Sequence, residues 1–183
     1  MFGSYVDWST VLYFVAIGIF VISLFLSGAV KSTFRKLSEE STARRITGGT
    51  AAQTILRNNG ITDVSIQYAN GLLGDNYNPI NKTLNLSDDV INRASIAAVA
   101  VAAHECGHAI QHQERYLPVI IRGWIVPVAN FGSNAGYLIF FLGLLIAKTE
   151  FLMDIGIALF AFAVLFHLIT LPVEFDASRR GLR

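Results

Sequence analysis

The chain has 183 residues, of which 53% are hydrophobic and 15% are charged, and its mean hydropathy is +0.51. This composition is too apolar for an ordinary soluble domain and indicates membrane-spanning segments. The net charge of +1 provides no global basic field for nucleic acid, and the single cysteine, Cys106, excludes an internal disulfide and suits a reducing compartment.

Three segments, residues 11–30, 124–147 and 151–173, are long and apolar enough to cross a bilayer as helices, which takes about 20 residues. The first has no basic residue before it and an apolar core too long for a signal peptide, so we expect an anchor. The second and third are joined by "KTE" alone and are predicted to form an antiparallel hairpin.

Basic residues flank these segments on one side. They are Lys31, Arg35, Lys36, Arg44 and Arg45 after the first, Arg115 and Arg122 before the second, and Arg179, Arg180 and Arg183 after the third. The first ten residues carry no Lys or Arg, and the link between the last two segments carries only Lys148. The positive-inside rule therefore predicts an outside N-terminus, with residues 31–122 and the C-terminal tail in the cytoplasm.

Between the first and second spans, the sequence predicts a small α+β region. Residues 41–59 resemble an amphipathic helix that ends at Asn59-Gly60. Alternating apolar residues over 63–69 predict a strand, and residues 71–87 predict a hairpin whose turn lies at 79–82. Ser87 offers an N-cap for a long helix over about 89–113.

The motif His104-Glu105-Cys106-Gly107-His108 falls on that long helix. Two histidines four residues apart share a helix face, about 6 Å apart, and can bind one Zn²⁺. Glu105 is then placed to act as general base toward a zinc-bound water. The alternative is a buried helix with hydrogen-bonded histidines, but the Ala/Val face that precedes the motif on a predicted helix favours zinc. Cys106 lies on another face and is expected to be a packed thiol.

A catalytic zinc needs a third protein ligand. His112 lies about 12 Å from His104 along a continuous helix, too far to share the metal unless the helix turns sharply after Gly107. The hairpin formed by the last two spans returns the chain to the cytoplasmic side, where Glu174 is the first acidic residue. Glu174 is therefore the expected third ligand, and the alternative is an interfacial carboxylate at a span end.

Three ordered motifs, "HECGHAIQH", the upstream "GLLGDNYNP…TLNLS" and the downstream "LPVEFDAS", resemble the YugP-type membrane zinc metallopeptidases, which are distantly akin to the HtpX-like gluzincins. The resemblance covers about residues 43–182. It implies a zinc endopeptidase of the bacterial plasma membrane with one Zn²⁺ per chain, His104, His108 and Glu174 as ligands, and Glu105 as base. In the wider gluzincin pattern an aspartate orients a ligand histidine from the position of Ser178, so Asp176 is a candidate for that role here.

The sequence also suggests residues that could stabilise the oxyanion or bind the substrate. Tyr77, Tyr116 and Arg179 are candidate oxyanion donors. Leu73, Asp75 and Tyr77 lie on a segment that could offer an open strand edge to an extended peptide, or could form an ordinary hairpin.

The predicted fold class is a mainly α membrane protein, with three transmembrane helices and a small cytoplasmic α+β zincin-type domain that carries a short hairpin sheet. Residues 1–30 form the anchor, 31–117 the protease domain, 118–173 the transmembrane hairpin, and 174–183 the segment with the third ligand. The expected partners are the lipid bilayer and a protein or peptide substrate, which could itself be a membrane protein, and not nucleic acid.

The leading functional prediction is a membrane-anchored endopeptidase that cuts at the cytoplasmic surface. An intramembrane protease is the first alternative, but the apolar run before His104 is only about ten residues, too short to span. A membrane scaffold with a structural zinc is the second, and an intact Glu105 beside only three good ligands argues against it.

Overall fold

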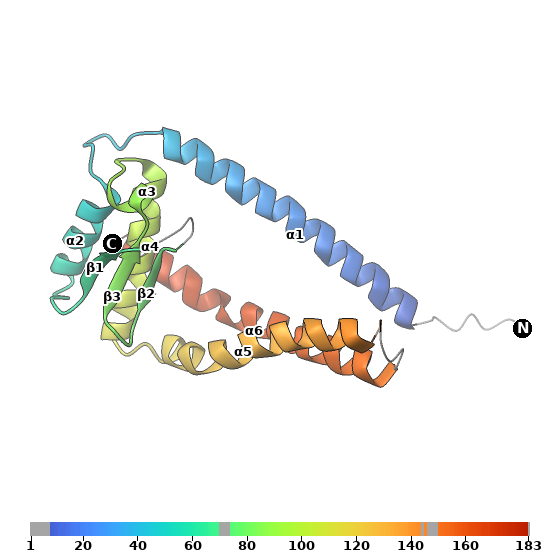
Figure 1. Cartoon of the computed structure of the whole chain (residues 1–183). Helices are drawn as coiled ribbons and strands as arrows, with labels where there is room; N and C mark the ends of the chain where they lie inside the picture. The colour runs from blue at the N-terminus through green and yellow to red at the C-terminus, as the bar shows by residue number, and fades with distance from the viewer. Residues whose placement is uncertain (1–7, 70–73, 144, 146–149, 183) are drawn as a thin grey trace, which may run out of the picture.

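The structure, a computed structural model, describes residues 8–69, 74–143, 145 and 150–182. The elements are α1 (Trp8–Glu39), α2 (Gly48–Asn58), β1 (Ser65–Tyr68), β2 (Asn76–Asn78), β3 (Thr83–Leu86), α3 (Asp88–Ile91), α4 (Ile96–Gln113), α5 (Leu117–Leu142) and α6 (Glu150–Gly181). α2, α3, α4 and the strands gather at one end, from which α1, α5 and α6 extend (Figure 1).

The three strands form one sheet in the order β1-β3-β2. β1 runs parallel to β3, and β2 pairs antiparallel with β3 so that Tyr77 lies opposite Leu84. The hairpin with its turn at 79–82 is therefore confirmed. Leu84 and Leu86 of the central strand are fully buried and belong to the same core as Leu56 of α2 and Ala102 of α4. The sheet and α2 thereby fix one side of α4.

The prediction of one long helix over 89–113 is wrong. The chain forms the short α3, leaves the helix at Asn92, and begins α4 at Ile96. Ser95 caps α4 by accepting a hydrogen bond from the Ala98 amide at 3.2 Å. The break lets Ala94 accept a backbone hydrogen bond from Thr42 at 2.9 Å, so pairing with a distant segment outweighs helix continuation.

The predicted helix over 41–59 begins later than expected. Thr47 caps α2, since its hydroxyl accepts from the Thr50 amide at 3.2 Å. Gly48 then lies so close to α4 that an added Cβ would stand 2.8 Å from the carbonyl oxygen of Ala98. The end of α2 agrees with the prediction, because Gly60 adopts a φ of 68° just after it.

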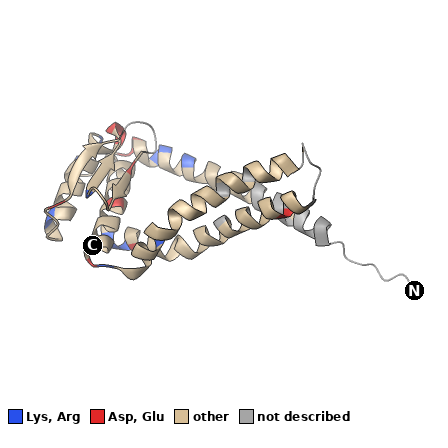
Figure 2. Ribbon diagram, turned by 60° about the horizontal axis from the view of Figure 1, so that its bottom comes forward, with Lys and Arg blue, Asp and Glu red and all other residues tan. Residues whose placement is uncertain are grey.

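α5 and α6 lie side by side as an antiparallel pair, as the short link predicts (Figure 1). Leu117–Leu142 and Asp154–Gly181 are long and apolar enough to cross a membrane. The remaining expected span, residues 11–30, lies inside α1. That this segment crosses the membrane stays a prediction. In Figure 2, positions of Lys and Arg colour the end of the α1 ribbon that adjoins the small domain, and long stretches of α5 and α6 carry no charged residue.

α6 crosses α4 with almost no space between the two backbones. A Cβ at Gly107 of α4 would overlap the carbonyl oxygen of Ala177, and one at Gly181 of α6 would overlap that of Ala103. Small residues at a crossing point let helices approach closer than the usual 8–10 Å. The last turns of α6 are therefore held directly against the helix that carries the histidine motif.

The close crossing predicts that adding a single methyl group at Gly107 destabilises the fold. We expect Gly107→Ala to lower the free energy of unfolding by about 1–3 kcal/mol, because the new Cβ can be accommodated only by moving backbone. The matched control is Gly123→Ala in α5, where nothing lies within 4 Å of the added Cβ. The control should be neutral or slightly stabilising. Thermal unfolding in detergent compares them, and equal midpoints for the two variants would contradict the close crossing.

Candidate metal site

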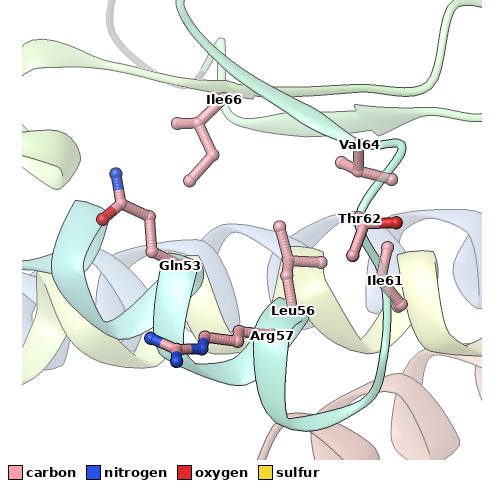
Figure 3. A pocket seen from close by; sticks show the side chains of 7 residues that line it. All are labelled: Gln53, Leu56, Arg57, Ile61, Thr62, Val64 and Ile66. Atoms are coloured by element: carbon pink, nitrogen blue, oxygen red, sulfur yellow. The ribbon is translucent and has the colours of Figure 1, made fainter.

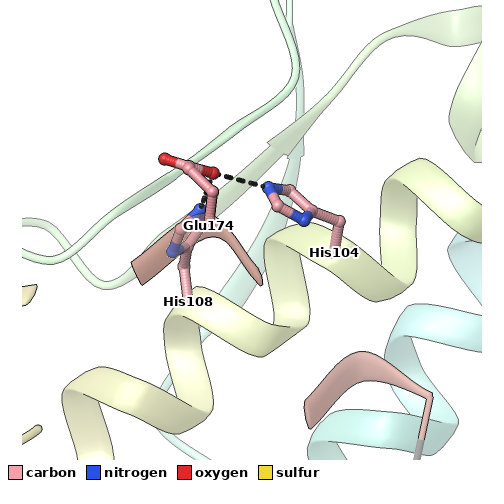
Figure 4. A group of neighbouring side chains, drawn as sticks. All are labelled: His104, His108 and Glu174. Atoms are coloured by element: carbon pink, nitrogen blue, oxygen red, sulfur yellow. Dashed lines mark hydrogen bonds and ion pairs between the residues drawn. The ribbon is translucent and has the colours of Figure 1, made fainter. Parts of the chain in front are cut away.

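His104 and His108 project from successive turns of α4 toward Glu174 of α6 (Figure 4). Glu174 Oε2 lies 3.1 Å from His104 Nε2 and 3.4 Å from His108 Nε2, and the candidate ligand atoms all lie within 4.8 Å of one another. Two imidazole nitrogens and one carboxylate oxygen are the donor set of a catalytic zinc. Tetrahedral bonds near 2 Å place ligand atoms about 3.3 Å apart, so the residues fit zinc.

A buried glutamine determines which nitrogen of His108 is free. The Gln111 side-chain amide donates to the Val173 carbonyl and to Asp176 Oδ2, both at 2.8 Å. Its Oε1 is therefore the atom that faces His108 Nδ1 at 3.0 Å, and that nitrogen must carry the proton. The unprotonated Nε2 of His108 then points at Glu174 and has its lone pair available for a metal.

Ser178 lies beside His104, as Gln111 lies beside His108. Its Oγ lies 2.9 Å from His104 Nδ1, so Ser178 is itself in contact with this candidate ligand. Asp176, the predicted substitute, bonds no histidine and accepts instead from Gln111 and from Arg180 Nε at 2.5 Å. Asp176 therefore acts on His108 only through Gln111.

Arg122 of α5 completes the surroundings of Glu174 and was missed as a site residue by sequence reasoning. Its guanidinium pairs with Oε1 of Glu174, the oxygen that does not face the histidines. The ion pair leaves Oε2 directed at the two imidazoles. The only sequence signal was that Arg122 and Glu174 both lie near the same end of the predicted membrane hairpin.

Glu105 directly follows His104 on α4 and faces β2. Its Oε2 accepts a hydrogen bond from the Tyr77 amide at 3.0 Å, which fixes the carboxylate against the strand. Burial raises the pKa of Glu105 above its usual value. A carboxylate whose pKa is raised accepts a proton more readily, which suits a general base beside the candidate metal site.

Two other potential metal-binding side chains of α4, His112 and Cys106, stay outside the cluster, as the helix geometry predicts. His112 Nδ1 lies 3.0 Å from the Tyr77 hydroxyl and is not among the clustered ligand atoms. Cys106 is fully buried, its thiol faces the Ala52 carbonyl at 3.7 Å, and burial raises its pKa to about 12. Cys106 is therefore a packed thiol.

Of the predicted substrate segment, Leu73 lies outside the described residues. Asp75 accepts hydrogen bonds from the amide and hydroxyl of Ser87, at 2.6 and 3.2 Å. These bonds tie the start of β2 to the start of α3. Tyr77 follows on the same strand, with its amide on Glu105.

The remaining oxyanion candidates have other neighbours. The ring of Tyr116 lies under the guanidinium of Arg180, 5.2 Å from its centroid, and Arg180 also pairs with Glu114. Arg179 is exposed. Roles for Tyr116 and Arg179 in the reaction stay predictions.

A cavity of about 310 Å³ lies between α2 and the chain that leads into β1 (Figure 3). Leu56, Ile61, Val64 and Ile66 supply most of its apolar lining, and Gln53 and Arg57 lie at α2. It shares no residue with the group of His104, His108 and Glu174.

The sequence profile of the family described as "Putative neutral zinc metallopeptidase" matches residues 12–183, and the chain belongs to this family. A relative in Bacillus subtilis (strain 168), "Putative membrane protease YugP", is 42% identical over 168 residues, which cover 92% of this chain and 74% of the relative. No solved structure matches the chain. Family membership confirms the predicted resemblance and implies zinc.

The third ligand can be tested by metal content. We expect Glu174→Ala to lose zinc, because it removes one of three donor atoms, whereas His112→Ala should keep it. Zinc per protein is measured by inductively coupled plasma mass spectrometry after desalting. Zinc loss in the His112 variant with retention in the Glu174 variant would reverse the assignment.

Ser178 provides a separate test of the bond to His104. We expect Ser178→Ala to weaken zinc affinity about 10-fold or more, because loss of the partner frees the imidazole to rotate. Competition with a fluorescent zinc chelator gives the dissociation constant. Ser38→Ala is the matched control, since its hydroxyl bonds only the Phe34 carbonyl within α1. Unchanged affinity in Ser178→Ala would show that the bond does not orient the ligand.

Proposed function

We propose that this protein is a membrane-anchored zinc endopeptidase that hydrolyses peptide bonds beside the membrane, with His104, His108 and Glu174 as zinc ligands. The observation that carries the proposal is the convergence of these three side chains next to Glu105. When bound, zinc supplies a Lewis acid that polarises the peptide carbonyl and makes water a nucleophile at neutral pH. Family membership supports the same reading.

In this proposal Glu105 moves the proton. The Tyr77 amide holds Glu105 Oε2, so Oε1 is the oxygen available to accept a proton from water. After attack on the carbonyl, the same carboxyl group delivers that proton to the leaving amine. Attachment of Glu105 to β2 keeps it in one position for both transfers.

The edge of the sheet favours an extended peptide as substrate. β2 is the last strand in the order β1-β3-β2, so one side of it has no strand partner among the described residues. An extended chain can pair with such an edge by backbone hydrogen bonds. Tyr77 lies on this strand and contacts Glu105, so a peptide along β2 passes beside the general base.

The position of the site supports substrates close to the membrane. Arg122 stands in the second turn of α5, and Glu174 lies in the last turns of α6, so the site is at one end of the helical hairpin. The predicted orientation puts this end in the cytoplasm. Membrane proteins and their cytoplasmic segments are the substrates that this position favours. A zinc with a purely structural role usually has four protein ligands, whereas the described residues offer three.

The general base is tested by Glu105→Gln. We expect it to lower cleavage of an unfolded protein by about 10²–10⁴-fold, because the amide cannot accept the proton, while zinc content stays that of wild type. Chelation should abolish the wild-type activity and added zinc should restore it. A zinc-loaded Glu105→Gln protein that cleaves at the wild-type rate would overturn the mechanism.

A further inference from the structure

A second cavity, of about 570 Å³, adjoins the proposed reaction site. Ala109 and His112 line it, and they follow Glu105 by four and seven residues, which places all three on one face of α4. The ring of Tyr77 forms a wall, with its hydroxyl 3.0 Å from His112. Because one helical turn rises about 5.4 Å, the cavity begins roughly one turn beyond Glu105.

The two cations that line the cavity differ in their surroundings. Lys82 and Arg115 both line it, but Lys82 forms an ion pair with Asp63, which is also a lining residue. Within the part of the chain that the structure describes, the Arg115 side chain makes no ion pair or hydrogen bond. The lining therefore has one uncompensated positive charge.

Both cations stand where the backbone favours glycine. Arg115 has a φ of 55° just after α4, and Lys82 has a φ of 52° at the end of the hairpin turn. The equivalent position after α2 is Gly60, with a φ of 68°. Left-handed backbone is sterically unfavourable for residues with a Cβ, and glycine adopts it without strain. Glycine can therefore replace Arg115 without disturbing the backbone, which makes Arg115→Gly a clean way to remove the charge.

We propose that this cavity binds an acidic side chain of the substrate and that Arg115 is its charged partner. The inference rests on the proposed function, since a peptide paired with β2 passes Tyr77 and can direct a side chain past it. A carboxylate fits better than a phosphate, because Asp63 in the same cavity repels a dianion more strongly than a single negative charge. Arg115 is thus a specificity residue that takes no part in bond cleavage.

The test uses pairs of fluorogenic peptides that differ only in Glu or Gln, with the substitution moved along both sides of the cleaved bond. In neutral detergent we expect kcat/KM to favour the Glu peptide by about 5–10-fold at one position, as for a single partly exposed charged contact. Arg115→Gly should abolish the preference while it keeps cleavage of the Gln peptide. Arg115→Glu should reverse the preference in favour of Gln.

Arg45→Gly is the matched control. Arg45 has the same φ of 52° as Lys82, is exposed, and does not line the cavity. Its replacement removes one positive charge and one left-handed non-glycine residue, as Arg115→Gly does. We expect both variants to fold and Arg45→Gly to keep the full Glu preference. Loss of preference in both would overturn the assignment to Arg115.

A binding measurement separates this inference from the proposed function. The zinc-loaded Glu105→Gln protein is titrated with labelled Glu and Gln peptides and followed by fluorescence anisotropy. Suppose that the Glu peptide binds more tightly than the Gln peptide, that this difference depends on Arg115, and that the wild-type protein cleaves neither. This result would support the acidic-side-chain site and refute the proposed protease activity. Cleavage by the wild-type protein, together with equal affinity for the two peptides, would refute only the proposal that the cavity binds an acidic side chain. Loss of the preference in nanodiscs of anionic lipid, but not of neutral lipid, would assign the cavity to a headgroup and overturn the proposal.

Discussion

The close crossing of α4 and α6 is the constraint on which the candidate metal site depends. A zinc site tolerates errors of only a few tenths of an ångström in ligand position, and the three candidate ligands here come from two helices. Gly107 and Gly181 remove the side chains that would separate the two backbones. A wider crossing would move Glu174 away from both histidines at once, so the glycines set the geometry of a site to which they contribute no ligand.

Each of the three candidate ligands also contacts a second polar side chain that orients it. Ser178 contacts His104, Gln111 fixes His108, and Arg122 pairs with the outer oxygen of Glu174. Gln111 is fully buried and has both of its amide functions bonded, so it orients His108 without leaving an unsatisfied group. Such supporting contacts reduce the conformational freedom that the ligands lose on binding a metal.

The sequence predicted the parts of the site that follow from local geometry and simple topology. The i, i+4 spacing separates His104 and His108 from His112, and the short link between two spans brings Glu174 back to them. The break before Ile96 was not predictable, because it depends on pairing with the distant Thr42. The roles of Gln111 and Arg122 were missed for the same reason: the partner of a polar side chain is decided by tertiary contacts that no sequence spacing encodes.

The hairpin of α5 and α6 and the small domain each hold only part of the candidate site. The histidines and Glu105 belong to α4, whose other side packs on α2 and the sheet, whereas Glu174 and Arg122 belong to α6 and α5. Separation of the hairpin from α4 would therefore remove one ligand and its ion-pair partner together. It would also break the two hydrogen bonds that the Gln111 side chain donates to Val173 and Asp176 of α6. The ability to bind metal is consequently coupled to correct packing of the long apolar helices, so a misassembled chain would lack a complete site.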